Sequence, residues 1–321
     1  MIRVSVVVPT CHRPDLLGRL LDALDAQDFD PAGSEVIVAD DAASDATRRQ
    51  VEERSARSRA VVRYARVTGP HGPAAARNVG WRAARGEIVA FTDDDCVPDP
   101  HWLTAGVSSF AEGVVAASGR VVVPLSREPT DYERDAAGLE GAEFVTANCF
   151  CRRDALEAVG GFDARFEAAW REDSDLHFAL LQRGGRLVQA PRAVVVHPVR
   201  PAPWGVSLRQ QRKSLYDALL YKKHPESYRR RIRRGPPWDY YAIVAAIGAG
   251  TASLAVGRPW LATAAWALWA GLTLRFCARR LRRTSWLPGH VTEMVATSVL
   301  IPPLSVAWRL YGAWKFRVLF L

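Results

Sequence analysis

The sequence contains few of the features that stabilise small secreted or zinc-dependent domains. Its 321 residues include five cysteines, an odd number, and no two of them have CxxC spacing. We therefore expect neither a disulfide framework nor a structural zinc, and this cysteine usage favours a reducing compartment. Cys149 and Cys151 are expected to be packed thiols. The amino-terminal MIRVSVVVPT has too short an apolar run for a secretory signal and predicts a first strand instead.

Acidic residues are scarce in the last third of the chain. Residues 206–321 hold 19 Lys+Arg against four acids, whereas residues 1–205 hold 24 arginines against 30 acids. The sequence pI of about 9.7 therefore describes the tail. A basic tail can bind nucleic acid, but RNP, helix-turn-helix and zinc-finger patterns are absent, and the arginines lie beside long apolar runs. We expect membrane lipids as partners and no nucleic acid.

Two apolar runs, YYAIVAAIGAGTASLAVG and WLATAAWALWAGLTLRF, follow the basic amphipathic segment 206–238. Each is about 17 residues, roughly 25 Å of helix against a hydrocarbon core of about 30 Å. The short GRP link between them predicts a transmembrane helical hairpin over residues 239–277. Arginine clusters on both outer flanks place those flanks, and the preceding domain, on the cytosolic side of the cytoplasmic membrane. For residues 278–321, which contain Pro302-Pro303, we expect an interfacial or re-entrant helix rather than a third span.

The amino-terminal part alternates β-branched runs with amphipathic helical patterns. VSVVV, EVIVA, AVVRYARV and EIVAF predict strands, and the segments between them predict helices. This alternation is typical of a parallel sheet with helices on both faces. From about residue 102 to 197 the connections lengthen, which favours a mixed extension of the same sheet. We therefore expect residues 1–205 to form one α/β catalytic unit.

Polar residues follow several of these strands, most conspicuously three consecutive aspartates in FTDDDCVPD. Three adjacent like charges at the end of a buried strand require a cation or hydrogen-bond donors nearby. Asp40-Asp41 ends a neighbouring strand, and ligands in such sheets lie beyond the carboxyl ends of the strands. Hard oxygen ligands placed there suit a divalent ion that bridges phosphates. A solvated acidic turn is the simpler alternative, and the aspartate-rich motif of prenyl-chain synthases would need helices where this chain has β-branched residues.

Four segments in order carry a resemblance to a known family. These are VSVVVPTCHRPDLLGRLLDAL, EVIVADDAASDAT, GPAAARNVGWRAARGEIVAFTDDDCVPD and ANCFCRRDALEAVGGFDARFEAAWREDSDLHFALLQRGG. Over roughly residues 2–200 the chain resembles a family 2 glycosyltransferase of the GT-A fold, a Rossmann-like mixed sheet. The resemblance implies a UDP-, GDP- or dTDP-sugar donor and a lipid-linked or glycan acceptor.

The resemblance also implies roles for individual residues. Pro9 and Thr10 would lie under the nucleotide base, and Asp41 would bind the base. Arg77 would lie near the diphosphate, and Asp93 and Asp94 would also bind the donor, with Asp94 facing the ribose. Asp95 would bind Mg²⁺ or Mn²⁺, with His197 as a further ligand; a lone histidine after a strand is also commonly structural. Helix-packing is an equal alternative for Arg77. Ala42 and Cys11-His12 depart from the family pattern, which leaves the preferred base open.

Glu172-Asp173, in WREDSD, matches the acidic pair of the acceptor wall. The resemblance implies that Asp173 is the general base, and a single base without a carboxylate nucleophile predicts inversion. Acids in the first turn of a helix are also favoured by the helix dipole alone. Two alternatives stay open: a non-catalytic membrane scaffold, and a sugar nucleotidyltransferase, although PTCHRPD lacks the glycine-rich basic loop that the latter needs.

Overall fold

The computed structural model describes residues 1–320 and divides the chain into two compact units. The first contains Met1–Pro124 and Ala137–Val199, and the second contains Leu125–Ala136 and the residues from Arg200 onward. The catalytic unit expected over residues 1–205 therefore includes one inserted segment, 125–136, that packs within the second unit.

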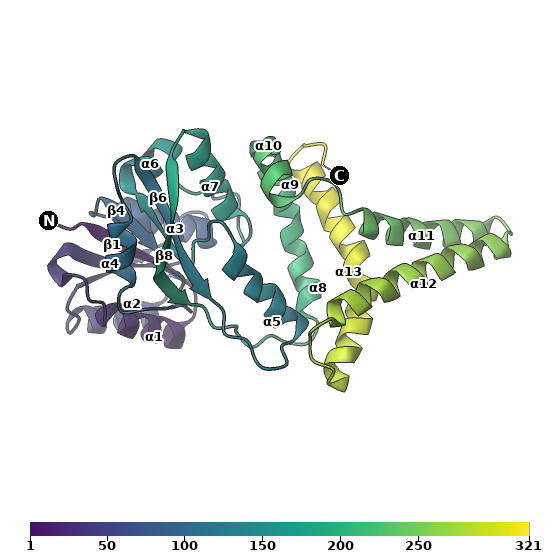
Figure 1. Cartoon of the computed structure of the whole chain (residues 1–321), viewed down its shortest axis with the longest axis horizontal. Helices are drawn as coiled ribbons and strands as arrows, with labels where there is room; N and C mark the ends of the chain where they lie inside the picture. The colour runs from purple at the N-terminus through teal and green to yellow at the C-terminus, as the bar shows by residue number, and fades with distance from the viewer. Residues whose placement is uncertain (321) are drawn as a thin grey trace. The chain divides into compact units, whose positions relative to one another are not determined.

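The first unit is built on one eight-stranded mixed sheet (Figure 1). Its strands, in the spatial order β3-β2-β1-β4-β7-β6-β8-β5, have these bounds: β1 Val4–Thr10, β2 Ser34–Asp40, β3 Val61–Arg66, β4 Ile88–Phe91, β5 Val97–Pro98, β6 Val114–Val122, β7 Cys149–Arg152 and β8 Arg186–Val196. The first four strands pair in parallel, whereas β7 is antiparallel to both β4 and β6. The parallel half and its mixed extension both match the expectation from the sequence.

Helices cover both faces of this sheet because its central strands are apolar on both sides. Val4, Val6 and Val8 pack with α1 (Pro14–Asp25), α2 (Asp45–Ser55) and α4 (Trp102–Ser108). On the opposite face Val7 packs with α3 (Pro73–Ala83), α6 (Arg153–Val159) and α7 (Glu172–Gln182). Alternate residues of one strand thus fill two cores, as the two-residue period of a strand requires. Cys149 and Cys151 are buried free thiols in the second core.

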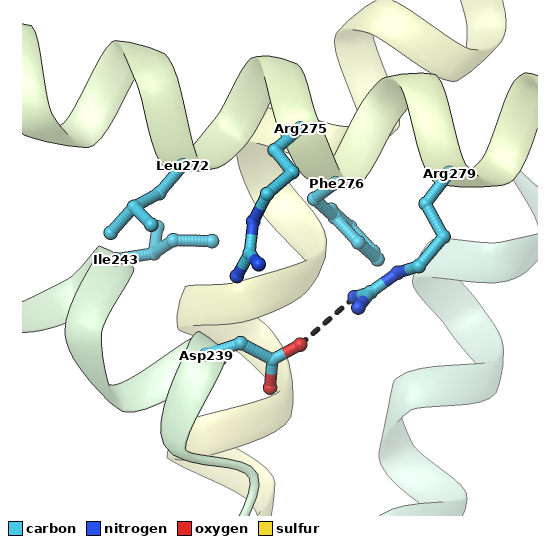
Figure 2. A pocket seen from close by; sticks show the side chains of 6 residues that line it. All are labelled: Asp239, Ile243, Leu272, Arg275, Phe276 and Arg279. Carbon is cyan, nitrogen blue, oxygen red and sulfur yellow. Dashed lines mark hydrogen bonds and ion pairs between the residues drawn. The ribbon is translucent and has the colours of Figure 1, made fainter.

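The second unit is helical. It contains α5 (Asp131–Ala136), α8 (Val206–Gln210), α9 (Leu215–Lys223), α10 (Pro225–Ser227), α11 (Trp238–Ala255), α12 (Pro259–Leu281) and α13 (Pro288–Lys315). Helices α11 and α12 lie side by side as a long hairpin (Figure 1). At the base of the hairpin Asp239 pairs with Arg279 at 2.9 Å, beside Arg275 and Phe276 (Figure 2). A charged layer therefore closes the apolar hairpin at one end.

Within the described residues, two helices are long and apolar enough to cross a membrane, α12 and α13. Helix α13 continues for 28 residues through Pro302 and Pro303, where we expected only an interfacial or re-entrant helix. Many large apolar side chains on the second unit are exposed, among them Trp260, Trp266 and Trp314. Length, composition and exposure favour contact with lipid, and the number of spans stays a prediction.

Candidate active site

Each of the three consecutive aspartates after β4 has its own basic side-chain partner. Arg77 Nη2 lies 2.6 Å from Asp93 Oδ1, and Arg13 Nη1 lies 3.0 Å from Asp94 Oδ1. His197 Nε2 lies 3.5 Å from Asp95 Oδ1. The positive charge that the sequence required is therefore supplied by two arginines, one in the loop after β1 and one on helix α3, while a histidine directly after β8 lies beside the third aspartate. Arg13 was not singled out in the sequence, although it follows the first strand by three residues.

Asp94 is held where the parallel strands end. Thr10 Oγ1, at the end of β1, donates a hydrogen bond of 2.7 Å to Asp94 Oδ2, while Arg13 donates to Oδ1. Asp94 is only 1% exposed, and this burial raises the pKa of its carboxyl group. The hydrogen bond from Thr10 and the charge of Arg13 act in the opposite direction and lower the pKa. Both donors favour the charged form. Pro9 and Thr10 pair in register with Ala39 and Asp40 of β2, so they lie at the edge expected for the donor.

Arg77 connects the aspartate loop to the acidic pair on α7. Its guanidinium donates from Nη2 to Asp93 and from Nη1 to Glu172 Oε1 at 3.1 Å. The residue is 2% exposed, and its charge centre lies 5.8 Å from the ring centroid of Phe162. A buried guanidinium is stabilised only by such paired carboxylates. These contacts favour a positioning role for Arg77; contact with a diphosphate stays a prediction.

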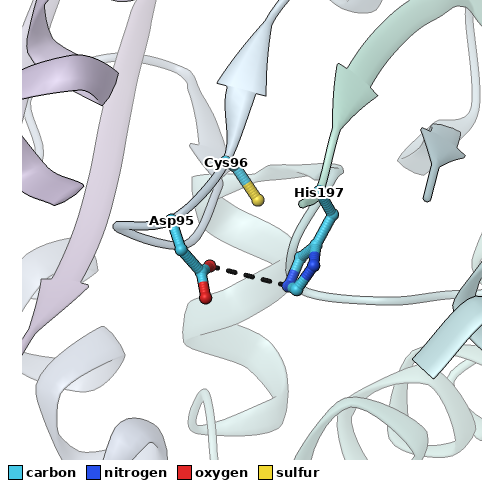
Figure 3. A group of neighbouring side chains, drawn as sticks. All are labelled: Asp95, Cys96 and His197. Carbon is cyan, nitrogen blue, oxygen red and sulfur yellow. Dashed lines mark ion pairs between the residues drawn. The ribbon is translucent and has the colours of Figure 1, made fainter. Parts of the chain in front are cut away.

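Asp95 and His197 come together because two strands pair. Val97 of β5 is the register partner of Val196 of β8, which places the residues before β5 beside the residue after β8. Asp95, Cys96 and His197 each offer one ligand atom, all within 4.8 Å of one another (Figure 3). His197 Nδ1 is buried and has no hydrogen-bond partner within residues 1–320.

A carboxylate oxygen and an imidazole nitrogen suit Mg²⁺ or, better, Mn²⁺. The Cys96 thiol does not suit them, because burial raises its pKa well above the usual range and keeps it protonated. The donor set at Asp95 and His197 therefore fits the cation that the family resemblance implies.

The two aspartates that end β2 have separate tasks. Asp40 is fully buried and accepts hydrogen bonds from the backbone of Ala42 and Ser44 and from Tyr64. Burial, together with the negative charge of Asp40, raises the pKa of Tyr64 to about 12. Asp40 therefore shapes the turn and is unavailable to a ligand.

Asp41 is held by the loop that precedes α3. His71 Nδ1 lies 3.0 Å from Asp41 Oδ1, and the Gly72 N–H donates 2.9 Å to Oδ2. These bonds fix the orientation of the carboxylate at the carboxyl end of β2. Burial and the nearby charges of Asp41, Asp40 and Asp94 raise the pKa of Cys11, in that order. Cys11 therefore lies in the same negatively charged region as Asp41, the predicted base-binding acid.

Glu172 and Asp173 open α7, directly after Arg171 in the left-handed conformation at φ 75°. Burial, then the charge of Asp173, raises the pKa of Glu172 to about 7. Burial also raises the pKa of Asp173, although Ser174 and Arg77 oppose the shift. Both hydrogen bonds to Asp173, from the Ser174 N–H and hydroxyl, end on Oδ1. Asp173 Oδ2 accepts neither of these two bonds.

The structure thus joins most of the predicted residues in three contacts: Thr10 with Asp94, Asp93 with Glu172 through Arg77, and Asp95 with His197. Asp41 is instead bound to the loop before α3. Such a group can bind a diphosphate and a cation at one sheet edge while a carboxylate stands ready as a base.

Comparison with known proteins gives a consistent answer. The sequence profile described as glycosyl transferase family 2 matches residues 5–167, and that of glycosyl transferase family group 2 matches residues 88–311. Glycosyltransferase AglE of Haloferax volcanii is 28% identical over 220 residues, which is 65% of this chain and 70% of AglE. The pre-mycofactocin glycosyltransferase of Mycobacterium tuberculosis is 31% identical over 209 residues, 58% of this chain and 43% of that longer protein.

Solved structures agree on the fold. Mannosyltransferase PcManGT from Pyrobaculum calidifontis, in complex with GDP-Man and Mn²⁺, superposes with a TM-score of 0.58 at 22% identity and covers 98% of this chain and 87% of its own. Residues 1–349 of Staphylococcus aureus TarS, in complex with UDP, give 0.50 at 19% identity, with 97% and 92% covered. The expected GT-A fold is confirmed. The chain belongs to glycosyl transferase family 2 and is a glycosyltransferase.

Proposed function

We propose that this protein transfers a sugar, with inversion, from a nucleoside-diphosphate sugar to a lipid-linked or glycan acceptor at the cytoplasmic face of a membrane. The observation that carries the proposal is the group at the sheet edge, in which Arg77 links the aspartate loop to the Glu172–Asp173 pair. Donor residues and the base are thereby held by one buried guanidinium.

Donor binding is assigned to the edge formed by β1, β2 and β4. Asp41 is aimed by His71 and Gly72 and would accept hydrogen bonds from the base, and Pro9 and Thr10 would lie under it. Asp94 would face the ribose. Two structural neighbours are complexes with nucleotide sugars, PcManGT with GDP-Man and TarS with UDP-GlcNAc, so both nucleotide sugars are donor candidates for this chain.

Asp95 and His197 would hold Mg²⁺ or Mn²⁺. When bound, such a cation stabilises the negative charge of the departing diphosphate. His197 supports this assignment because its Nε2 lies beside Asp95 while its Nδ1 is buried without a partner within the described part of the chain. Asp93 is taken by Arg77, which leaves the cation to the third aspartate.

Asp173 would take the proton of the acceptor hydroxyl. A raised pKa makes a carboxylate a stronger base, and burial raises that of Asp173. Glu172 holds Arg77 rather than the acceptor, which makes it a positioning residue in this scheme. Attack from the side of Asp173, opposite the diphosphate, inverts the anomeric centre.

The second unit would place the enzyme on the membrane. Helices α12 and α13 have the length and composition of spans, and arginines cluster in the last turn of α12 and just after it, at Arg279, Arg280, Arg282 and Arg283. The positive-inside rule predicts that this end of α12 lies on the cytosolic side. An acceptor that is itself attached to lipid would meet the active site there.

The proposal is tested by titrating UDP, GDP, dTDP and their common sugars into the detergent-solubilised protein by calorimetry, with Mn²⁺ and with EDTA. We expect one nucleotide series to bind in a metal-dependent way. Asp95→Ala should abolish that dependence, and Asp45→Ala, which removes an exposed acid on α2, should leave it intact. Absence of binding to every nucleotide would overturn the proposal and favour a non-catalytic scaffold.

A further inference from the structure

An inserted segment leaves the catalytic sheet between β6 and β7 and belongs to the helical unit. Residues 125–136, which include α5, pack with the residues that follow Arg200. The two strands it connects are neighbours in the sheet, next to β4, which leads to the aspartates, and β8, which leads to His197. The segment is therefore a covalent link, in two places, between the helical unit and the strands of the site.

One arginine binds this segment to the helical unit. Arg280, in the last turn of α12, donates to Asp131 Oδ2 from Nε at 3.0 Å and from Nη2 at 2.7 Å. Its Nη1 donates to the hydroxyls of Thr297 and Ser298 of α13 at 2.7 and 3.1 Å. The Arg280 side chain is 8% exposed. A fifth, longer bond runs from Nη2 to the Ser207 hydroxyl of α8 at 3.5 Å. A buried guanidinium bonded to partners on three other helices specifies one arrangement of those helices.

Two weaker contacts add to this pair. The Ser285 N–H donates to the carbonyl of Pro129 at 2.9 Å, and Arg134 Nη1 donates to the carbonyl of Arg283 at 3.3 Å. Both join the segment to the turn between α12 and α13. The segment is thus held at Pro129, Asp131 and Arg134, and the bond between Arg280 and Asp131 is the buried one.

The other end of the segment leads toward the base. Glu140 Oε1 accepts a 2.7 Å hydrogen bond from the Val123 N–H, which closes the neck of the insertion within the catalytic unit. A few residues on, the ring of Phe144 stacks on His177 of α7, with centroids 5.3 Å apart. Asp173 lies one turn earlier on the same helix. The chain that leaves the segment therefore contacts the helix that carries the proposed base.

We propose that Arg280 and Asp131 are positioning residues for the sugar-transfer step. They restrain the β6–β7 connection and, through Phe144, helix α7, whereas donor binding at β1, β2 and β4 does not depend on them. This inference rests on the proposed function, in which Asp173 acts in transfer and the aspartate loop acts in donor binding.

The test uses the full-length protein in detergent and three readouts: turnover of the nucleotide sugar found by titration, Kd for UDP and GDP, and the rate of tryptic cleavage after Arg134. Asp131→Asn keeps the size of the side chain and removes its charge. The matched control is Asp239→Asn, which breaks the neighbouring but more exposed Arg279–Asp239 pair outside the insertion (Figure 2). Arg280→Lys is a milder variant that keeps the charge but loses the two-pronged bond.

We expect Asp131→Asn to lower kcat about tenfold and to speed cleavage after Arg134, with Kd within about twofold of wild type. Arg280→Lys should change kcat and the cleavage rate in the same direction but by less. The double variant with Asp131→Arg and Arg280→Asp, which exchanges the two charges, should recover much of the lost kcat. Asp239→Asn should match wild type. Faster cleavage with unchanged kcat, or a kcat loss matched by a loss of nucleotide affinity, would overturn the inference. A wild-type protein without turnover would instead overturn the proposed function, while the cleavage rates still report on the Arg280–Asp131 pair.

Discussion

Replacing Glu172 by glutamine should change how the stability of the catalytic unit depends on pH. Burial and the charge of Asp173 raise the pKa of Glu172 from 4.5 to about 7 in the folded protein. The folded state therefore binds this proton more tightly than the unfolded state does. Below pH 4.5 Glu172 is protonated in both states and does not change the free energy of unfolding. Between pH 4.5 and 7 its contribution lowers the free energy of unfolding as the pH rises.

The size of this effect follows from the shift. A difference of about 2.5 pKa units at about 1.4 kcal/mol per unit gives a penalty of roughly 3 kcal/mol, complete above pH 7. Glutamine carries no charge at any pH, so Glu172→Gln should remove the contribution of Glu172 to the slope between pH 4.5 and 7. Arg77 keeps Asp93 as its charged partner in this variant.

Urea unfolding followed by pulse proteolysis, read on fragments of the catalytic unit, measures the slope at several pH values. Glu112→Gln, an exposed acid, is the matched control and should keep the wild-type slope. A Glu172→Gln protein whose stability still falls by about 3 kcal/mol between pH 4.5 and 7 would refute the reasoning.

Substitutions of Asp173 and of Glu172 should differ in their effect on activity. Loss of a general base typically costs about 10²–10⁴-fold, so Asp173→Asn should lower kcat by that amount with nucleotide binding unchanged. Glu172→Gln should retain most activity, because it leaves Asp173 in place and keeps an Oε1 acceptor for the bond from Arg77. If Asp173→Asn stays active while Glu172→Gln is inactive, the base is assigned to the wrong carboxylate.

Three further outcomes follow from single contacts. Arg13→Gln removes the charged partner of Asp94 and should weaken nucleotide binding about tenfold, with stability nearly unchanged, by calorimetry. His197→Asn should weaken Mn²⁺ binding, measured without nucleotide, by about 10–100-fold; unchanged affinity would remove His197 from the site. Gly72→Ala should lower the urea midpoint by an amount equivalent to roughly 1–3 kcal/mol, because Gly72 has φ 110° and an added Cβ would lie 2.5 Å from the Glu167 carbonyl oxygen.

The local sequence pattern was sufficient to predict much of the fold and the acidic residues of the site. The β-branched runs before Thr10, Asp40 and Asp93 are strands in the structure, because strands buried on both faces need such residues. Parallel pairing then brings their carboxyl ends to one edge, which is why the aspartates could be grouped from the sequence.

The arginine partners of Asp94 and Glu172 could not be predicted, because they are distant in sequence. Arg13 is 81 residues from Asp94, and Arg77 is 95 residues from Glu172. Any of the many arginines could have filled those positions, and only the paired register of strands and helices selects among them. Local composition gave no sign of an interaction at such separations.

The helical unit shows the same limit. Two consecutive prolines usually kink or end a helix, but α13 continues through Pro302 and Pro303, since packing against neighbouring helices offsets the two lost hydrogen bonds. The insertion 125–136 was also missed, because nothing in its short polar sequence marks it as part of the other unit. Its membership follows from contacts such as that of Asp131 with Arg280, 149 residues away.

The anomeric configuration of the first product tests the central claim most directly. The donor found by titration is supplied as its α-linked nucleotide sugar, and proton NMR follows the first sugar transferred to acceptor or water. The account predicts a β-configured product, because Asp173 would act on the face opposite the diphosphate. An α-configured first product would contradict it and would require a different role for Asp173.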